Sequence, residues 1–370
     1  MSRREYAELG AIDLEFGGTL PAVRVAYQTW GEPRYVDGRI VNTVLVEHAL
    51  TGDAHVSGPV GPDQPTPGWW NGLIGAGRTL DPADWFVLAS NVLGGCRGTT
   101  GPSSSAPDGR PWGSRFPRIT IRDQVKVEAA LADHLGIERF AAVLGGSMGG
   151  MRVLEWLAAH PDRVASALVL ATGAAVTADQ LGTQTTQLTA IRSDAAWQGG
   201  DYYPGPGPAT GLGLARRIAH LTYRTEFELE TRFGRAFQDG EDPYRGGRFA
   251  VQSYLDHHAD KLVGRFDAGS YVALTEAMNS HDLGRDRGGV PTALRGIDTP
   301  IVVAAIDSDR LYPVRQLAEI AELAPGCAHF EIIASPYGHD GFLIELGAVS
   351  QLVTRTLSLA SVDTAQSSGG

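Results

Sequence analysis

The chain has 370 residues, of which 43% are hydrophobic and 20% are charged, so it can bury a substantial core as one large domain or as two. Its formal net charge of −11 argues against general nucleic-acid binding, and no apolar stretch is long enough to predict a membrane span. The two cysteines, Cys96 and Cys327, are too few for a disulfide framework or a cysteine-based zinc site, and the N-terminus lacks the apolar segment of a secretory signal peptide. We therefore expect a cytoplasmic protein that binds neither nucleic acid nor membrane.

Short apolar runs along the chain predict the buried strands of a sheet. After short strands in the first 45 residues, such runs occupy residues 41–47, 86–90, 140–144, 167–171, 301–306 and 330–334. Segments with helical periodicity lie between several of them, at residues 123–135, 148–160, 313–323 and 347–359. This alternation predicts an α/β fold in which helices cover both faces of a mostly parallel central sheet.

The segment between the apolar runs at 167–171 and 301–306 is far longer than a crossover helix requires. It carries helical patterns at 180–193, 212–235 and 249–266, with a Gly/Pro-rich break at 199–213. We predict a helical lid domain at 173–299, inserted into a core domain made of residues 1–172 and 300–360, and a disordered tail at 361–370. An insertion after a late strand falls at the carboxyl edge of the sheet, where ligands bind.

Residues 145–150 read GGSMGG and fit the pattern G-x-S-x-G around Ser147. The motif follows an apolar strand and opens a helix, which is the strand–turn–helix context of a nucleophile elbow. Such a turn strains the serine backbone and leaves little room for Cβ atoms at its neighbours, so glycines surround it. Ser147 is therefore the candidate nucleophile.

A serine nucleophile requires a base and a carboxylate that orients the base, and in sheets of this kind they follow the serine in the order acid, then histidine. His339 lies in the loop SPYGHDGF, just after an apolar strand. Asp307 and Asp309 lie in the loop IDSDRLYP, just after another. We favour Asp309, because it lies farther into its loop and can reach a neighbouring loop, while Asp307 remains the alternative.

Two backbone N–H groups are candidates for stabilising an oxyanion. The first belongs to Met148, which follows the nucleophile at the start of a helix, where the helix dipole is favourable. The second belongs to Leu50 in the loop HALTGD, which follows an early strand, as the second donor of such sites does.

In several ordered blocks the sequence resembles the homoserine O-acetyltransferases, a family within the α/β-hydrolase superfamily. The blocks are HALTGDAH, PGWWNGLIG, NVLGGCRGTTGPSS, PWGSRFP, IRDQV, GGSMGGM and YGHDGFL. The resemblance implies an α/β-hydrolase fold and acetyl transfer from acetyl-CoA to the hydroxyl of L-homoserine, by a ping-pong route through acetyl-Ser147. It also implies that Asp309, in the block SDRLYP, orients His339.

The resemblance further implies residues that hold the substrate. An arginine for the homoserine carboxylate matches Arg216, although the adjacent Arg217 is an alternative register. The set is completed by Tyr223, by Asp340 as a partner for the ammonium group, and by Thr51 in the oxyanion loop. The family is typically homodimeric through its lid helices, acetyl-CoA is a substrate and not a bound cofactor, and no metal is expected.

Alternative activities remain open from the residues. A carboxylic-ester hydrolase would need no substrate arginine, and a related acyltransferase could use succinyl-CoA or acylate another alcohol. A binding module without catalysis would not require the intact set of Ser147, Asp309 and His339. We expect Cys96 to be a structural, buried residue. Packing roles are expected for Trp69, Trp70 and Trp112.

Overall fold

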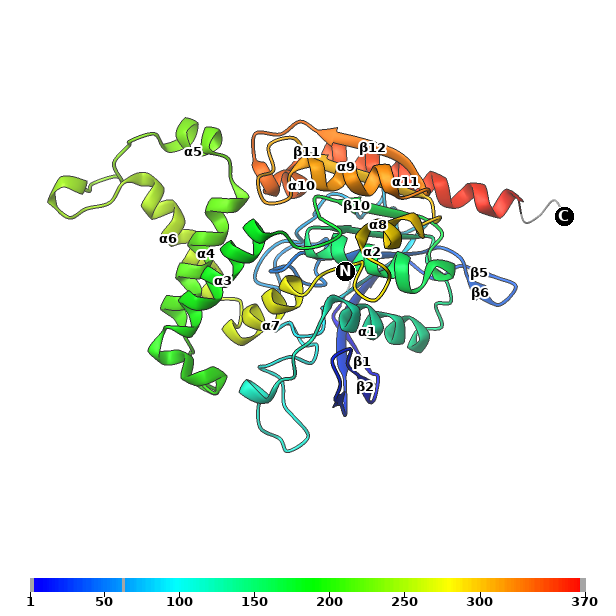
Figure 1. Ribbon diagram of the computed structural model, residues 1–370, viewed down its shortest axis with the longest axis horizontal. Helices are drawn as coiled ribbons and strands as arrows, with labels where there is room; N and C mark the ends of the chain where they lie inside the picture. The colour runs from blue at the N-terminus through cyan, green and yellow to red at the C-terminus, as the bar shows by residue number, and fades with distance from the viewer. Residues whose placement is uncertain (1–2, 62–63, 367–370) are drawn as a thin grey trace.

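An eight-stranded sheet forms the centre of the molecule in the computed structural model, which describes residues 3–61 and 64–366 (Figure 1). The strands lie in the order β1-β4-β8-β7-β9-β10-β11-β12. The pairs β1–β4 and β4–β8 are antiparallel and all later pairs are parallel, which confirms the predicted, mostly parallel sheet. The strands are β1 (Glu5–Glu8), β4 (Arg24–Trp30), β7 (Thr43–Glu47), β8 (Phe86–Ser90), β9 (Ala142–Gly146), β10 (Ala167–Leu170), β11 (Ile301–Ile306) and β12 (Cys327–Ile333).

The central strands bury both of their faces, which explains why they read as continuous apolar runs. In β11, Ile301 and Val303 belong to one hydrophobic cluster, whereas Val302 and Ala304 belong to another. Successive side chains of a strand point to opposite faces, so the two clusters lie on opposite sides of the sheet. Two small hairpins accompany the sheet: β2 (Ile12–Asp13) with β3 (Thr19–Leu20), and β5 (Tyr35–Val36) with β6 (Arg39–Ile40).

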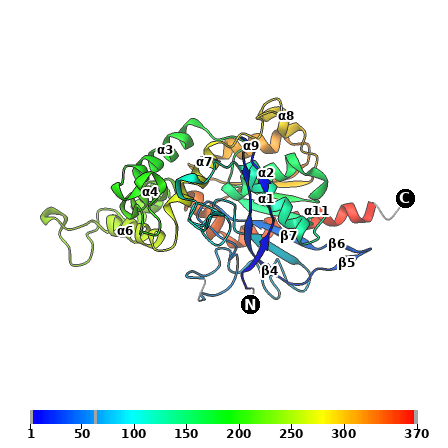
Figure 2. The same ribbon diagram turned by 90° about the horizontal axis from the view of Figure 1, so that it is seen from below.

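Helices cover both faces of this sheet (Figure 2). The first cluster includes residues of α1 (Ile121–His134), α2 (Met148–Ala159), α8 (Val290–Arg295) and α9 (Val314–Leu323). The second includes Val349, Leu352 and Val353 of α11 (Leu346–Gln366), which follows the short α10 (Gly341–Ile344). In α1, Thr120 and Asp123 form a reciprocal capping box, which fixes the start of the helix.

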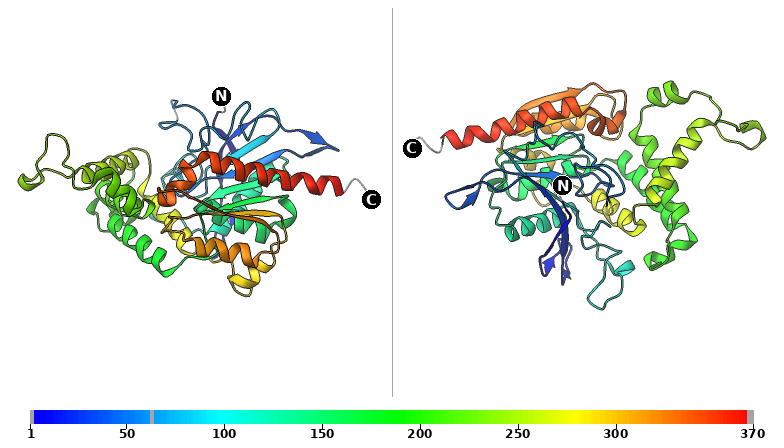
Figure 3. Two further views of the ribbon diagram at one scale, coloured as in Figure 1. Left: turned by 90° about the horizontal axis from the view of Figure 1, so that it is seen from above. Right: turned by 180° about the vertical axis from the view of Figure 1, so that it is seen from behind.

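The remaining helices belong to the segment between β10 and β11 and project to one side of the sheet (Figures 1 and 3). They are α3 (Ala178–Arg192), α4 (Ala209–Tyr223), α5 (Glu226–Phe233), α6 (Ala250–Val263) and α7 (Ala268–Asn279). The end of α4 meets the loop after β12, since the ring centroids of Tyr223 and His339 are 5.7 Å apart. The inserted helices therefore reach the carboxyl edge of the sheet.

The expectation of one helix over residues 212–235 is wrong. Arg224 adopts an extended conformation (φ −104°, ψ 154°) and ends α4. The hydroxyl of Thr225 then accepts a hydrogen bond from the Glu228 N–H at 2.9 Å, so that Thr225 caps a new helix. Helices α7 and α8 were not predicted from the sequence.

The C-terminal region lies on the far side of the molecule from the inserted helices (Figure 3). α11 extends to Gln366, so it overlaps the tail expected at 361–370; residues 367–370 lie outside the described part of the chain. Among the described residues no single helix is long and apolar enough to cross a membrane. One bent pair, Gly338–Ile344 with Leu346–Ala360, passes that test by length and composition, with an angle of 68° between its halves.

Candidate active site

Ser147 lies in the sharp turn between β9 and α2, with φ 58° and ψ −125°. A non-glycine residue with positive φ is strained, and such strain concentrates at functional sites. The glycines around it are required sterically. A Cβ on Gly149 would lie 2.3 Å from the Glu47 carbonyl oxygen, and one on Gly145 would lie 2.5 Å from the Gly149 carbonyl oxygen. The turn therefore has the geometry predicted for a nucleophile elbow.

Ser147, His339 and Asp309 form a continuous hydrogen-bonded chain. Nε2 of His339 lies 2.9 Å from Oγ of Ser147, and Nδ1 of His339 lies 2.7 Å from Oδ2 of Asp309. All three side chains are buried; Ser147 follows β9, whereas Asp309 and His339 follow the adjacent strands β11 and β12, and β10 lies between β9 and β11. An imidazole held in this way can take the proton from the serine hydroxyl while the carboxylate fixes its tautomer.

The structure distinguishes the two candidate aspartates. The second oxygen of Asp309 accepts hydrogen bonds from the N–H groups of Leu311 (2.8 Å) and Tyr312 (3.0 Å), which aims the carboxylate at His339. Asp307 instead accepts a hydrogen bond from the Ser335 N–H at 3.0 Å and so links the loops after β11 and β12. Asp309 is the residue that the fold brings to the histidine.

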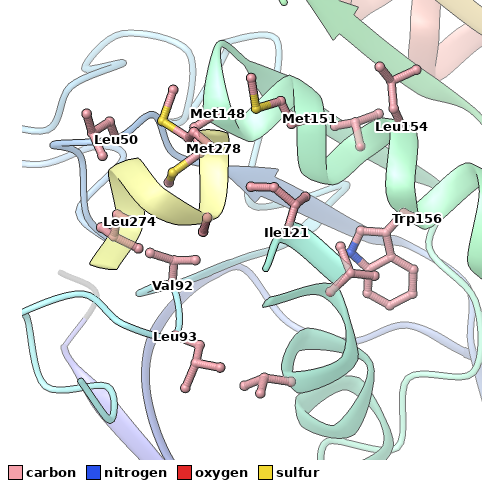
Figure 4. Close-up of a cluster of buried hydrophobic side chains, with 14 of the residues drawn as sticks. Leu50, Val92, Leu93, Ile121, Met148, Met151, Leu154, Trp156, Leu274 and Met278 are labelled. Carbon is pink, nitrogen blue, oxygen red and sulfur yellow. The ribbon is translucent and has the colours of Figure 1, made fainter. Parts of the chain in front are cut away.

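The two expected oxyanion donors lie beside the nucleophile. Met148 is the first residue of α2, and Leu50 lies in the loop after β7. Within the described residues, neither N–H donates to another protein atom. Their side chains are buried in one cluster with Leu274 and Met278 of α7 (Figure 4). Two N–H groups without acceptors, one of them at the start of a helix, can stabilise developing negative charge.

A cavity of about 220 Å³ adjoins the triad and contains three of the four expected substrate residues. Thr51 contributes from the oxyanion loop, Arg216 from α4 and Asp340 from the residue after His339. Tyr223 does not line this cavity but lies between it and the triad. Its ring centroid is 5.5 Å from the Arg216 guanidinium carbon and 5.7 Å from the His339 ring centroid.

Arg216 and Arg217 differ in what they contact. Arg217 forms an ion pair with Asp256, with 3.0 Å between Nη2 and Oδ1. Nε of Arg216 is buried and has no hydrogen-bond partner among the described residues. Of the two registers considered, the fold directs Arg216 into the cavity. A guanidinium whose buried nitrogen has no partner favours binding of an anion.

Asp340 forms an ion pair with Arg224, a pairing that the sequence did not predict. Nε of Arg224 lies 3.1 Å from Oδ2 of Asp340. Burial raises the pKa of Asp340, and the nearby guanidinium groups of Arg224 and Arg216 oppose that rise. Arg224 and Asp340 are distant in the sequence, so no local pattern could have shown this contact. Arg224 lay in the middle of the helix predicted over residues 212–235, and only the break after α4 brings it to Asp340.

Two histidines form a neutral part of the cavity wall. Nε2 of His220 lies 2.6 Å from the Tyr254 hydroxyl, and the His220 and His258 rings stack with centroids 4.1 Å apart. Burial and the charge of Arg216 lower the pKa of His220 to about 2 and that of His258 to about 4. At neutral pH the positive charge of the wall therefore comes from its arginines and from Lys261.

Three aromatic residues and one cysteine were expected to be structural. Trp70 is fully buried and donates to the Phe342 carbonyl at 3.1 Å, and Trp112 packs against the first cluster. Trp69 also borders the cavity. Burial raises the pKa of Cys96 to about 11, which keeps the thiol protonated. Over residues 3–61 and 64–366, no group of three or more His, Cys, Asp or Glu could hold a metal ion.

Comparison with known proteins identifies the family of this chain. Residues 42–346 match the α/β-hydrolase fold family. The homoserine O-acetyltransferase of Nocardia farcinica is 60% identical over 353 residues, which cover 95% of this chain and 92% of that protein. The solved homoserine O-acetyltransferase from Bacillus anthracis matches with a TM-score of 0.87 and 25% identity, covering 96% of this chain and 98% of that one.

A hydrolase shares the same architecture. Esterase E22 matches with a TM-score of 0.86 and 23% identity, covering 96% of this chain and 100% of its own. The fold alone therefore does not separate transfer from hydrolysis. The sequence identity to curated relatives does separate them, and the chain belongs to the homoserine O-acetyltransferase family.

Proposed function

We propose that this protein transfers the acetyl group of acetyl-CoA to the hydroxyl of L-homoserine, giving O-acetyl-L-homoserine and CoA. The observation that carries the proposal is the combination of a hydrogen-bonded Ser147–His339–Asp309 chain with Arg216 in the adjoining cavity, where its buried Nε has no hydrogen-bond partner among the described residues. A hydrolase has no need of a cation at that place, whereas an amino-acid acceptor carries a carboxylate that requires one.

In the first half-reaction Oγ of Ser147 attacks the thioester carbonyl while His339 takes the hydroxyl proton. The N–H groups of Leu50 and Met148 stabilise the resulting oxyanion. The carbon–sulfur bond then breaks, and the imidazolium of His339 returns the proton to the CoA thiolate. Acetyl-Ser147 remains.

In the second half-reaction the homoserine hydroxyl gives its proton to His339 and attacks the acetyl carbonyl. The ester bond to Ser147 breaks, and the serine regains its proton from the imidazolium. Arg216 holds the homoserine carboxylate with paired hydrogen bonds, and Asp340 faces the ammonium group. Holding the acceptor in the cavity allows the hydroxyl to attack in place of water.

The defining experiment measures CoA release from acetyl-CoA and from succinyl-CoA, each with and without L-homoserine. Homoserine-dependent release from acetyl-CoA supports the proposal. A preference for succinyl-CoA would keep the mechanism and change the donor. Release that is independent of homoserine would identify water as the acceptor and make the protein a hydrolase.

We further propose that the protein is a homodimer that associates through its inserted helices. The outer surface of these helices exposes large apolar side chains, including Leu214 (49% exposed) and Leu221 (43% exposed) on α4 and Phe227 (65% exposed) on α5. Leu214 and Leu221 are seven residues apart and so lie on one face of α4. Exposed apolar surface of this kind favours a protein–protein interface.

A further inference from the structure

The peptide unit between Ala49 and Leu50 carries one of the two candidate oxyanion donors, the Leu50 N–H. The carbonyl oxygen of the same peptide unit is held by hydrogen bonds. The Ala49 carbonyl oxygen lies 2.8 Å from Nδ1 of His48 and accepts a second hydrogen bond from the Gly52 N–H at 2.9 Å. In a planar trans peptide the C=O and the following N–H point in opposite directions. Holding the Ala49 carbonyl therefore fixes the direction of the Leu50 N–H.

The hydrogen bonds of His48 specify one tautomer. Nε2 of His48 accepts a hydrogen bond from the Val92 N–H at 3.1 Å, so the ring proton lies on Nδ1 and is donated to Ala49. His48 is 2% exposed. Burial and the positive charge of Arg152 lower the pKa of His48 to about 3, so the ring stays neutral while the enzyme works.

A buried arginine holds the backbone of the same residue. Nη2 of Arg152, which belongs to α2, donates to the His48 carbonyl oxygen at 2.5 Å. Nη1 of Arg152 lies 2.5 Å from Oε1 of Glu128 and 2.6 Å from Oε2 of Glu47. Arg152 is 0% exposed. The helix that starts at the nucleophile is thereby attached to the loop that carries the second oxyanion donor.

Two buried glutamates, Glu47 and Glu128, share this arginine. Burial and the adjacent carboxylate of Glu128 raise the pKa of Glu47 well above its ordinary value. Glu128 also accepts a hydrogen bond from Trp156 Nε1 at 3.1 Å. A buried charge that is paired costs less than an unpaired one, and the pair holds a fixed geometry.

We propose that His48 and Arg152 are positioning residues that together aim the Leu50 N–H at the oxyanion. His48 holds the Ala49 carbonyl through Nδ1–H, and Arg152 anchors the His48 carbonyl to α2. Neither side chain touches a substrate. Loss of either side chain should slow both half-reactions, because each half-reaction passes through an oxyanion on the acetyl carbonyl. The inference rests on the proposed acyl-Ser147 route.

The first test compares His48→Leu with His48→Asn. Leucine removes the Nδ1–H donor, whereas the Asn amide can donate to the Ala49 carbonyl from the same place. Loss of a whole oxyanion donor costs about 10²–10³-fold in kcat, so a misdirected donor is expected to cost His48→Leu about 10–100-fold. The KM for acetyl-CoA and homoserine stays within about threefold, and His48→Asn recovers most of the rate. A folded His48→Leu enzyme with kcat unchanged would overturn the proposal.

The second test uses Arg152→Lys, which keeps the positive charge near Glu128 but loses the planar group that also reaches His48. We expect the same loss of kcat with KM retained. The matched control is Glu155→Gln, on the same helix. Glu155 is 2% exposed and paired with Arg287, but this pair does not contact the oxyanion loop. If His48→Leu fails to fold, Arg152→Lys decides the matter, and a wild-type kcat in that variant rejects the proposal.

A third readout separates this inference from the proposed function. A small alkylboronic acid forms a tetrahedral adduct with Ser147 without any acceptor, and p-nitrophenyl acetate acylates the serine without CoA. His48→Leu should weaken the boronic acid and slow acylation by about the same factor as kcat. If wild-type enzyme shows no homoserine-dependent transfer but the variants show these losses, the proposed function fails and the positioning role stands. Unchanged boronic acid affinity in the variants rejects the positioning role.

Discussion

Arg216 and Arg217 are adjacent in the chain, yet among the described residues only Arg217 has an ion-pair partner, Asp256, at 3.0 Å. The buried Nε of Arg216 has no hydrogen-bond partner in the part of the chain that the structure describes. An ion pair at the surface contributes little, whereas a buried guanidinium nitrogen without a partner is costly until an anion binds. This difference between the two arginines is the basis for predicting that Arg216 binds the acceptor's carboxylate.

The Arg216→Ala variant should raise the KM for homoserine by about 10–200-fold, which corresponds to loss of a charged hydrogen bond of about 1.5–3 kcal/mol. Acetylation of Ser147 by acetyl-CoA should proceed at the wild-type rate. Steady-state kinetics and the rate of the first half-reaction check both statements. Arg217→Ala is the matched control and should leave KM unchanged. Equal loss in both half-reactions of Arg216→Ala would contradict the assignment.

The Ser147→Ala variant should form no acyl-enzyme. Intact-mass spectrometry after mixing with acetyl-CoA should show the mass increase of one acetyl group in the wild type and none in the variant. Because Ser147 holds a strained conformation at φ 58°, the variant remains strained at that turn, and we expect its thermal stability to stay near that of the wild type. An acetylated variant would place the nucleophile elsewhere.

Asp309→Asn and Asp307→Asn should differ sharply in rate. An amide at position 309 cannot hold the His339 tautomer that accepts the serine proton, and comparable triads lose about 10⁴-fold in kcat by this change. Asp307 is exposed and its contact is with the Ser335 N–H, so Asp307→Asn should keep its rate and lose at most about 1 kcal/mol of stability. Assays of kcat and chemical denaturation measure the two effects. The reverse order of rates would move the orienting acid to Asp307.

Asp340 should make homoserine binding sensitive to pH. Its carboxyl has a pKa raised above the ordinary 3.8 by burial, so it takes up a proton at higher pH than an exposed aspartate does. Protonation removes the negative charge that faces the substrate ammonium, and the KM for homoserine should therefore rise as the pH falls through this raised pKa. Asp340→Asn should show a high KM without this dependence. A wild-type KM that is flat over the same range would reject the role.

The raised pKa of Asp340 also makes the stability of the folded protein depend on pH, and the direction of that dependence follows from the shift. The folded protein binds the Asp340 proton more tightly than the unfolded chain does, so this group's contribution to stability is lost as the pH rises from 3.8 through the raised pKa. Asp340→Asn should remove this contribution. The difference between the denaturation curves of the two proteins across that range is the measurement.

The proposed dimer predicts that a charge on the outer face of α4 disrupts association. Leu221→Glu should convert a dimer to a monomer in size-exclusion chromatography with light scattering, because a carboxylate buried in an apolar interface is costly. Ile332→Glu is the control, since Ile332 is also exposed (48%) but lies on the edge strand β12. A wild-type protein that is monomeric at micromolar concentration would reject the proposal.

The sheet and the triad could be predicted because both have strong local signals. Strands buried on both faces read as apolar runs, and β8 and β11 have the predicted bounds. The turn around Ser147 has no room for Cβ atoms at its neighbours, so the glycine motif in the sequence already indicates the geometry of the turn. These features depend on residues that are close together in the chain.

The substrate cavity could not be predicted in the same way, because its contacts join distant segments. Arg224 pairs with Asp340, and Arg217 pairs with Asp256. These two ion pairs determine which arginines near the cavity are already engaged. The helix break at Thr225 also depends on a distant partner, since the Thr225 hydroxyl donates to the Pro336 carbonyl at 2.7 Å. Composition and periodicity carry no information on such pairs.

The regular geometry of α4 has a consequence for the choice of acceptor. Arg216 and Tyr223 lie on one face of this helix, seven residues apart, which corresponds to about 10 Å along its axis. We expect Arg216 at one end of this interval to hold the acceptor's carboxylate, while the ring of Tyr223 at the other end lies against the imidazole of His339. Because a helix is stiff, it would fix where that carboxylate sits relative to the imidazole. Serine is shorter than homoserine by one methylene, so we predict that its hydroxyl reaches the acetyl carbon less well and that homoserine is acetylated faster.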